Sequence, residues 1–169
     1  MSKDVNVNWW EEGWEEGWED GRVAPANVRS ESCVFCSIVD GHEPDAVVFE
    51  SETSVAFLDR RPLFHGHTLV VPRRHVVTLA ELAADDIGPF WLDIQHISAA
   101  MPALLGAQGT FVANNNTVSQ SVAHLHVHVV PRTKGDGLRG FFWPRTSYAD
   151  GEALRVAAVL RCGLSATSQ

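Results

Sequence analysis

The spacing of apolar and polar residues divides the chain into several short strands and one long helix. Alternating or short apolar runs predict strands over residues 47–50, 54–58, 68–71 and 109–113. Between Asp85 and Leu105 the apolar residues recur at helical spacing, and Asp85 and Asp86 suit a helix N-terminus, where the dipole favours negative charge. Residues 149–160 predict a final helix. Strands grouped around one long helix indicate an α+β fold with an antiparallel sheet of about five strands.

Three local features complete this prediction. Residues 37–41 form a predicted short helical turn that ends on a glycine, and residues 59–62 and 65–67 are predicted turns between strands. On the long helix, the aromatic pair Phe90 and Trp91 is expected to lie in the core rather than in a ligand-binding site.

The last predicted strand carries three histidines. From Val122 onward the chain alternates, with His124, His126 and His128 on one face and apolar residues on the other. Side chains two residues apart lie about 6.6 Å apart along a strand, so the imidazoles form a row. The apolar face anchors this row against a core, and Pro131 ends the strand.

On the residues alone, the histidine row has three interpretations. The histidines are solvent-exposed or hydrogen-bonded without chemistry, or they hold a catalytic zinc, or one imidazole is a nucleophile that forms a covalent intermediate. Three histidines on one face favour chemistry over the first interpretation.

Composition limits the class of protein. With 169 residues and 45% hydrophobic residues, the chain can form one domain with a substantial core. No apolar run approaches the roughly 18 residues of a membrane span, and the N-terminus lacks the features of a signal peptide. Three cysteines do not indicate a disulfide framework, so a reducing cytoplasm is the expected location.

Charge is unevenly distributed along the chain. The formal net charge is −8, and residues 1–32 hold eight acidic and three basic residues, a net −5 that leaves −3 for the remainder. Nothing indicates the basic surface that nucleic acid requires. Small anionic ligands stay compatible with this charge, because a local pocket can be basic on an acidic protein.

The first 32 residues differ from the rest of the chain. Residues 9–21 repeat tryptophan, acidic residues and glycine with a period of four, and residues 23–32 have the composition of a linker. The segment is interpreted as a disordered tail or an artificial extension, or else as a docking peptide whose tryptophans fill a partner's groove. The folded domain is expected to span residues 33–165.

A Cys-x-x-Cys sequence opens that domain at Cys33 and Cys36. By itself it is compatible with a redox pair, half of a zinc site, or two inert apolar side chains. No βαβ pattern surrounds it, which disfavours the redox interpretation.

These residues together resemble the histidine-triad (HIT) family of nucleotide hydrolases and transferases. The family motif His-φ-His-φ-His-φ-φ, in which φ is apolar, matches residues 124–130 at every position. Further matches in family order are Gln-Ser-Val at 120–122, Phe-Leu-Asp at 57–59, Gly-His-Thr-Leu-Val-Val-Pro at 66–72, His75, and the cysteine motif. The resemblance covers Cys33 to about Arg145, and residues 1–32 have no counterpart in it.

The resemblance implies a compact α+β unit that pairs into a homodimer, with small-molecule nucleotides as substrates. His126 would attack the α-phosphorus of a nucleoside phosphate derivative and give a nucleotidyl-histidine. Hydrogen bonds to the phosphate oxygens, where charge develops, would come from Gln120, Ser121 and His128. The implied nucleotide-binding residues are Val34, Phe35, Ile38, Phe57, Leu58, Asp59, Asn114 and Arg132. Asp59 would accept hydrogen bonds from ribose hydroxyls.

Family members with the cysteine motif bind a structural zinc. Transferred residue by residue, the resemblance implies a closed tetrahedral set of Cys33, Cys36, His75 and His124. His67 is the nearest competitor for the third position, and its family match implies a structural hydrogen bond instead.

Two positions depart from the family pattern. Ser119 stands where many members have glycine, and the preceding turn at 114–116 is Asn-Asn-Asn, although asparagine tolerates left-handed backbone angles. The phosphate loop is therefore expected to be reshaped. Arg132 resembles the dinucleotide polyphosphate branch and would reach a distal phosphate.

The leading hypothesis is an enzyme that cleaves a nucleoside 5′-phosphate derivative, an adenylyl compound, through His126. Its substrate would be a dinucleotide polyphosphate or a nucleoside phosphoramidate. The alternatives are a zinc-dependent hydrolase that uses the histidine row, and a nucleotide-binding or scaffold protein with vestigial catalysis.

Overall fold

The computed structural model describes residues 33–42, 47–138 and 147–166. Its first compact unit extends to Thr133, and the second begins at Lys134. Within the described ranges, no helix is long and apolar enough to cross a membrane. The Trp-rich repeat lies outside the described residues.

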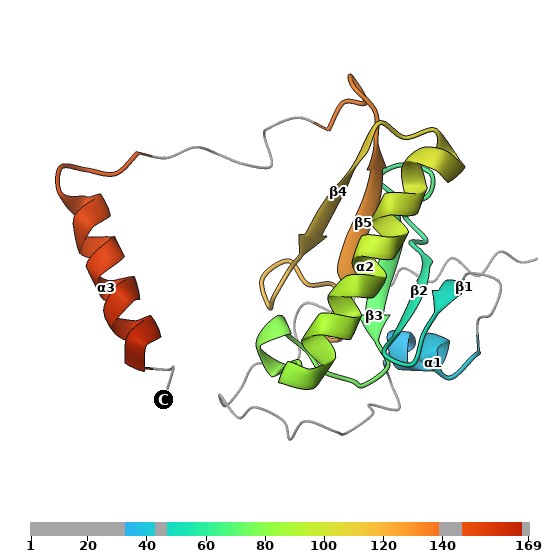
Figure 1. Cartoon of the computed structure of the whole chain (residues 1–169), viewed down its shortest axis with the longest axis horizontal. Coiled ribbons are helices and arrows are strands. Elements are labelled where there is room, and N and C mark those ends of the chain that lie inside the picture. The colour runs from blue at the N-terminus through green and yellow to red at the C-terminus, as the bar shows by residue number, and fades with distance from the viewer. Residues whose placement is uncertain (1–32, 43–46, 139–146, 167–169) are drawn as a thin grey trace, which may run out of the picture. The chain divides into compact units, whose positions relative to one another are not determined.

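The described residues of the first unit form five strands, two α-helices and a short 3₁₀ helix (Figure 1). The strands are β1 (Val47–Glu50), β2 (Ser54–Leu58), β3 (Thr68–Pro72), β4 (Gly109–Asn114) and β5 (Val127–Arg132). The helices are α1 (Val34–Val39), η2 (Leu79–Glu81) and α2 (Ala84–Leu105). The strands form one sheet in the order β1-β2-β3-β5-β4, with every pair antiparallel. This confirms the α+β fold and the five-stranded sheet.

The two faces of the sheet bury different side chains. The α2 face packs Ala56, Val70, Val127 and Val129 against Phe90 and the neighbouring apolar positions of α2. The opposite face carries the packed side chains of α1 and of alternating residues in β2 and β3: Phe35, Ile38, Val55, Phe57, Leu69 and Val71. This alternation follows the two-residue period of a strand, and it separates a structural face from the face that carries the histidines.

The last strand begins later than its sequence pattern predicts. Alternation suggested a strand from Val122, but β5 starts at Val127. The His124 N–H donates to the carbonyl of Val122, and the Leu125 N–H donates to the carbonyl of Val76. A turn and a contact outside the sheet therefore replace ladder pairing, and only His128 of the three histidines lies in the strand.

Several smaller predictions also need correction. Helix α1 starts at Val34, so Cys36 lies inside the helix rather than before it. On α2, Phe90 is fully buried as expected, but Trp91 is 39% exposed and is not a core residue. Neighbouring positions of a helix point about 100° apart, so a single apolar stripe cannot bury both.

The second unit contains the predicted C-terminal helix. Helix α3 covers Glu152–Ala166 rather than residues 149–160. The side chain of Glu152 accepts the main-chain N–H of Ala149, which connects the chain before the helix to its first residue. The proposed boundaries of the folded domain, 33 and 165, stay a prediction.

Candidate active site and metal centre

The triad histidines lie on the sheet face opposite α2. His128 pairs across the ladder with Leu69, a member of the apolar cluster on that face. His124 and His126 precede the strand and are 0% and 2% exposed. The ring centroids of His126 and His128 are 5.1 Å apart. The structure thus brings the imidazoles together, but two of them are buried more completely than a solvent-facing row would be.

Hydrogen bonds define the protonation pattern of His126. Its Nδ1 atom lies 2.7 Å from the carbonyl oxygen of His124. A carbonyl only accepts, so Nδ1 carries the proton and donates, and Nε2 keeps its lone pair. Burial lowers the pKa of His126, against smaller opposing effects of the His124 carbonyl and the Asp59 charge. The ring is therefore neutral at pH 7 and nucleophilic at Nε2.

His67 and His128 form a second chain of fixed donors. The main-chain N–H of Leu63 donates to Nδ1 of His67, at 3.2 Å, so the proton of His67 resides on Nε2. That atom lies 2.9 Å from Nδ1 of His128. Because Nδ1 of His128 accepts this bond, its Nε2 carries the proton. The carboxylate of Asp59 lies 3.4 Å from Nδ1 of His67, a longer contact.

Burial keeps both rings of this chain neutral. It lowers the pKa of His128 to about 4, assisted by the neighbouring His126 and His67. Burial also lowers the pKa of His67, and the Asp59 charge only partly opposes this. The resulting His128 is a neutral N–H donor beside the nucleophilic nitrogen of His126. His67 is thus a hydrogen-bonding residue and does not belong to the group formed by Cys33, Cys36, His75 and His124. With Asp59 and His128 it forms a second group of possible ligand atoms that lie within 4.8 Å of one another.

Four side chains converge on a possible metal position. The ligand atoms of Cys33, Cys36, His75 and His124 all lie within 4.8 Å of one another. The Nδ1 atom of His124 is 3.6 Å from each Sγ, and Cys36 Sγ is 3.2 Å from Nδ1 of His75. Zinc–sulfur and zinc–nitrogen bonds of about 2.3 and 2.05 Å in a tetrahedron place sulfur and nitrogen about 3.6 Å apart. The donor set and its spacing fit a closed zinc site.

The other ring nitrogen of His124 supports this fit. Nε2 lies 3.0 Å from the carbonyl of Pro72, so it carries the proton and leaves Nδ1 as a lone-pair donor. Burial lowers the pKa of His124 to about 4 and also lowers the pKa of His75. Both imidazoles are therefore neutral at pH 7, as a metal ligand must be.

The expected base pocket is only partly assembled. The ring centroids of Phe35 and Phe57 lie 5.2 Å apart. The Phe35 ring also packs edge-on against the His126 ring, with centroids 5.3 Å apart. Ile38 is buried in the same cluster as the two phenylalanines. Val34, on the same short helix, is 40% exposed.

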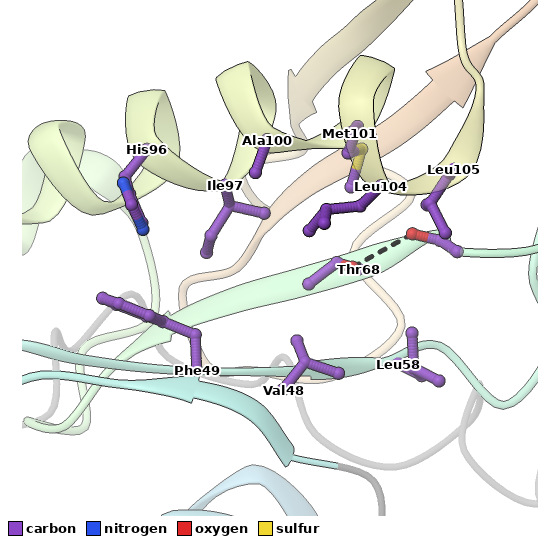
Figure 2. A pocket seen from close by; sticks show the side chains of 11 residues that line it. Val48, Phe49, Leu58, Thr68, His96, Ile97, Ala100, Met101, Leu104 and Leu105 are labelled. Carbon is purple, nitrogen blue, oxygen red and sulfur yellow. Dashed lines mark hydrogen bonds between the residues drawn. The ribbon is translucent and has the colours of Figure 1, made fainter.

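Leu58 faces the other side of the sheet. Adjacent residues of a strand face opposite sides, and Leu58 lines an apolar groove of about 470 Å³ on the α2 side. Figure 2 shows Leu58 below the residues of α2 that form the other wall of that groove. Its assignment to the base pocket stays a prediction, although the groove that Leu58 lines lies on the α2 side.

The loop before the triad is held by main-chain contacts. The side-chain oxygen of Gln120 accepts the N–H of Thr117, and its Nε2 donates to the carbonyl of Val77 at 2.6 Å. Gln120 thus closes the loop in this structure, and Ser121 is exposed beside it. Ser119 has a φ of 61°, a left-handed conformation that explains why glycine suits this position.

Two further predicted residues lie at the ends of the sheet. Asn114 donates from Nδ2 to the carbonyl of His126, and its Oδ1 is buried with no partner among the described residues. Arg132 ends β5, and its guanidinium carbon lies 5.9 Å from the ring centroid of Phe64. Phe64 and the two carbonyl acceptors of the triad, on Pro72 and His124, were not identified from sequence. Main-chain acceptors carry no residue-type signal.

Comparison with known proteins agrees with the fold. The HIT domain profile matches residues 40–135, more than half of the chain, and the chain belongs to the HIT family. An uncharacterized HIT-like protein of Methanocaldococcus jannaschii is 40% identical over 109 residues, which cover 62% of this chain and 82% of that protein.

Two relatives carry named activities. An adenosine 5′-monophosphoramidase of Schizosaccharomyces pombe is 33% identical over 115 residues, covering 67% of this chain and 84% of that protein. An adenylylsulfatase of Arabidopsis thaliana is 31% identical over 120 residues, covering 70% of this chain and 60% of that protein.

Solved structures share the architecture. A HIT family protein from Bacillus subtilis superposes with a TM-score of 0.70 and 30% identity, covering 78% of this chain and 96% of that one. A zinc-bound histidine triad family protein from Mycobacterium smegmatis has a TM-score of 0.60 and 36% identity, covering 80% of this chain and 97% of that one.

Proposed function

We propose that the protein cleaves a nucleoside 5′-phosphate derivative, an adenylyl compound, through a covalent bond between phosphorus and Nε2 of His126. The observation that carries this proposal is the 2.7 Å contact between Nδ1 of His126 and the carbonyl of His124. It leaves Nε2 as a neutral nucleophile. The adenylylsulfatase and phosphoramidase relatives, both named for adenylyl substrates, support the substrate class.

The reaction divides into two displacements at one phosphorus atom. The lone pair of His126 Nε2 forms the new N–P bond, and the leaving group departs with the electrons of the broken bond. The ring then carries a positive charge, which the His124 carbonyl stabilises through the retained Nδ1–H. Water or phosphate attacks the phosphorus next, releases the nucleotide and returns the electron pair to Nε2.

Neighbouring donors would stabilise the charge that develops on phosphorus. The Nε2–H of His128 lies beside the nucleophile and is fixed by His67, so it needs little reorganisation to donate to a phosphate oxygen. Ser121 would add a second donor from the loop. Gln120 would donate only after release of its contact with Val77, so we assign it to loop support rather than to phosphate binding.

The nucleoside would occupy the α1 side of the sheet. Phe35, Ile38 and Phe57 offer an aromatic and aliphatic wall for a base, with Val34 at its exposed edge. Asp59 would accept a ribose hydroxyl, and the unpartnered Oδ1 of Asn114 is a second acceptor for a substrate hydroxyl or amine. At the end of β5, Arg132 would pair with a distal phosphate.

We assign a structural zinc to Cys33, Cys36, His75 and His124, the group that converges within 4.8 Å. When bound, the ion would join α1 to the triad segment through charge-neutralised thiolates. Four protein ligands leave no position for an activated water, which disfavours a zinc-dependent hydrolase. Pairing into a homodimer remains part of this proposal.

Nucleotide release tests the proposal directly. The protein is incubated with adenosine 5′-phosphoramidate, adenylyl sulfate and diadenosine tetraphosphate, with and without inorganic phosphate, and products are separated by chromatography. AMP release from at least one substrate is expected, and His126→Ala should lose it by at least about 10³-fold. His96→Ala, an exposed histidine on α2, is the matched control and should retain activity.

Trapping distinguishes the covalent route from direct hydrolysis. Quenching with denaturant at alkaline pH, which preserves the acid-labile N–P bond, should give protein with the added mass of one nucleotidyl group, on the peptide that contains residues 124–128. Turnover of His126→Ala within about tenfold of the parent would overturn the assignment of the nucleophile.

A further inference from the structure

The segment that follows β3 supplies the fixed groups around the metal ligands. The carbonyl of Pro72 accepts the proton of His124 Nε2, at 3.0 Å. Three residues later, Nδ1 of His75 lies 3.2 Å from Cys36 Sγ. Two imidazoles of the proposed zinc site therefore depend on where residues 72–75 lie.

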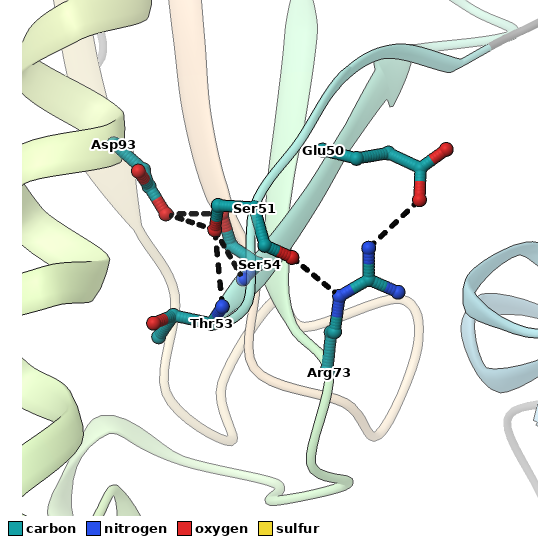
Figure 3. A network of polar contacts seen from close by, with 6 residues as sticks. All are labelled: Glu50, Ser51, Thr53, Ser54, Arg73 and Asp93. Atoms are coloured by element: carbon teal, nitrogen blue, oxygen red, sulfur yellow. Dashed lines mark hydrogen bonds and ion pairs between the residues drawn. The ribbon is translucent and has the colours of Figure 1, made fainter.

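Arg73 lies in the middle of this segment and is held by three contacts. Figure 3 shows the two that its side chain makes. Its main-chain N–H donates to the carbonyl of Thr53, at 2.8 Å. Its side-chain Nε donates to the carbonyl of Ser51, at 2.6 Å, and one terminal nitrogen lies 2.7 Å from a carboxylate oxygen of Glu50. Both the main chain and the side chain of Arg73 thus form hydrogen bonds to residues at the turn between β1 and β2.

That turn is itself fixed to the long helix. The hydroxyls of Ser51 and Ser54 both donate to one carboxylate oxygen of Asp93, at 2.7 and 2.8 Å. Ser54 is 0% exposed, and the Ser51 hydroxyl also accepts the N–H groups of Thr53 and Ser54. Figure 3 shows Asp93 on one side of the turn and Arg73 on the other. The core helix, the turn and the segment after β3 are therefore linked by one continuous network.

The contacts of Arg73 are not equivalent. Its side chain is 33% exposed and that of Glu50 is 58% exposed, so this ion pair contributes little in water. The bond from Nε to the Ser51 carbonyl is shorter and partly buried. It requires a donor along the side chain rather than at its tip, which a lysine cannot supply.

We infer that Arg73 is a positioning residue for the metal site: by fixing the segment after β3 to the β1–β2 turn, it sets the places of the Pro72 carbonyl and of His75. This inference rests on the proposed zinc site. Loss of the Arg73 side chain should let the segment move. Bringing the four ligands together would then require more free energy, and metal binding would weaken. A supporting residue of this kind changes metal affinity by about 10–100-fold.

The neighbouring arginine provides a matched control. Arg74 lies 3.6 Å from Asp86, and both side chains are substantially exposed, at 45% and 36%. Arg74→Ala removes the same charge and the same side chain from the adjacent position, yet leaves the β1–β2 turn untouched.

The test measures metal binding rather than activity. Zn²⁺ affinity is determined by competition with a chromophoric chelator, and Co²⁺ absorption reports a tetrahedral site with two thiolates. Arg73→Ala should weaken Zn²⁺ binding by about 10–100-fold and alter the Co²⁺ spectrum, whereas Arg74→Ala should match the wild type. Arg73→Lys, which keeps the charge but loses the Nε donor, should weaken binding to an intermediate degree.

The outcomes separate the two proposals. A wild-type protein that binds no Zn²⁺ overturns the zinc site and this inference with it, while leaving the His126 assay unaffected. Wild-type binding with equal affinity in Arg73→Ala and Arg74→Ala overturns the role of Arg73 alone. If Arg73→Ala does not fold, Arg73→Lys decides, and wild-type affinity in that variant would also overturn the inference.

Discussion

The Nε2 atom of His67 lies 2.9 Å from the Nδ1 atom of His128, and this contact sets the proton on the last histidine of the triad. The order of donors begins at the main-chain N–H of Leu63, which can only donate. Each ring accepts at Nδ1 and donates at Nε2, so the direction of the chain is determined. His128 consequently presents an N–H, rather than a lone pair, and its ring lies 5.1 Å, centroid to centroid, from that of His126, the proposed nucleophile.

Replacement of His67 should therefore impair turnover, although His67 itself is not proposed to contact the substrate. His67→Phe removes the donor to His128 Nδ1, so the ring can adopt the other tautomer and lose its N–H at Nε2. We expect kcat to fall by about 10–100-fold, the usual effect of removing a supporting hydrogen bond, with a smaller change in KM. ¹⁵N NMR of the histidine rings should show a mixed tautomer for His128.

His65→Phe serves as the control for this substitution. His65 lies two residues earlier in the same turn and is exposed, so its replacement changes the turn but no contact of the triad. A fall in kcat of equal size in both variants would assign the effect to the turn rather than to the tautomer.

The pH dependence of kcat/KM should report the environment of His126. Burial lowers the pKa of this ring below its usual 6.5, so the neutral nucleophile persists at pH 6.5 and is lost only at lower pH. The acid limb of the profile, which reports the free enzyme, is therefore expected below pH 6.5. A midpoint above that value would contradict the proposed burial effect.

Substitution of Asp59 should shift the acid limb of the kcat/KM profile. Its negative charge raises the pKa of His126 against the effect of burial, so Asp59→Asn should lower the pKa further and shift the acid limb to lower pH. KM should rise as well, because the proposed ribose acceptor is weakened. Asp93→Asn, on the opposite face of the sheet, should leave the midpoint of the profile unchanged.

Most of the fold could be predicted because its signals are local. The observed bounds of β1 and β2 agree with those predicted from the spacing of apolar residues. The long helix starts one residue earlier than predicted, at Ala84. The β5 start was wrong because alternation continues from Val122 through a turn that does not pair with the sheet. Periodicity reports which side chains are buried, and it does not report which main-chain groups bond to each other.

The same distinction separates the predicted and missed parts of the site. Cys33 and Cys36 lie 91 and 88 residues from His124 in sequence, yet the four metal-ligand candidates meet as the family resemblance implied. Phe57 and Leu58 were both assigned to one pocket, although neighbouring strand residues face opposite sides. The acceptors on Pro72 and His124, and the donor on Leu63, are main-chain atoms, which only the folded structure places.

Removal of the proposed zinc should destabilise the protein and leave its chemistry intact. A ligand that binds only the folded state at a free concentration 100 times its Kd stabilises it by about 2.7 kcal/mol, so chelation should lower the Tm by several degrees. Cys36→Ser should have a low Tm that no longer responds to a chelator, whereas Cys162→Ser should respond as the wild type does. Activity measured well below the Tm should survive chelation, and its complete loss with an intact fold would favour a catalytic metal.

The left-handed conformation of Ser119 yields a prediction about the departure from the family pattern. A non-glycine residue at a φ of 61° has a steric cost of roughly 1–2 kcal/mol, while glycine in the unfolded chain has a greater entropy, about 0.5–1 kcal/mol. Ser119→Gly should therefore leave the free energy of unfolding unchanged or raise it by up to about 1.5 kcal/mol, as measured by urea denaturation. Ala123→Gly, in the same loop but without a positive φ, has no strain to relieve and should lower it. Equal destabilisation by both substitutions would show that Ser119 is not strained, and that its presence in place of glycine has another cause.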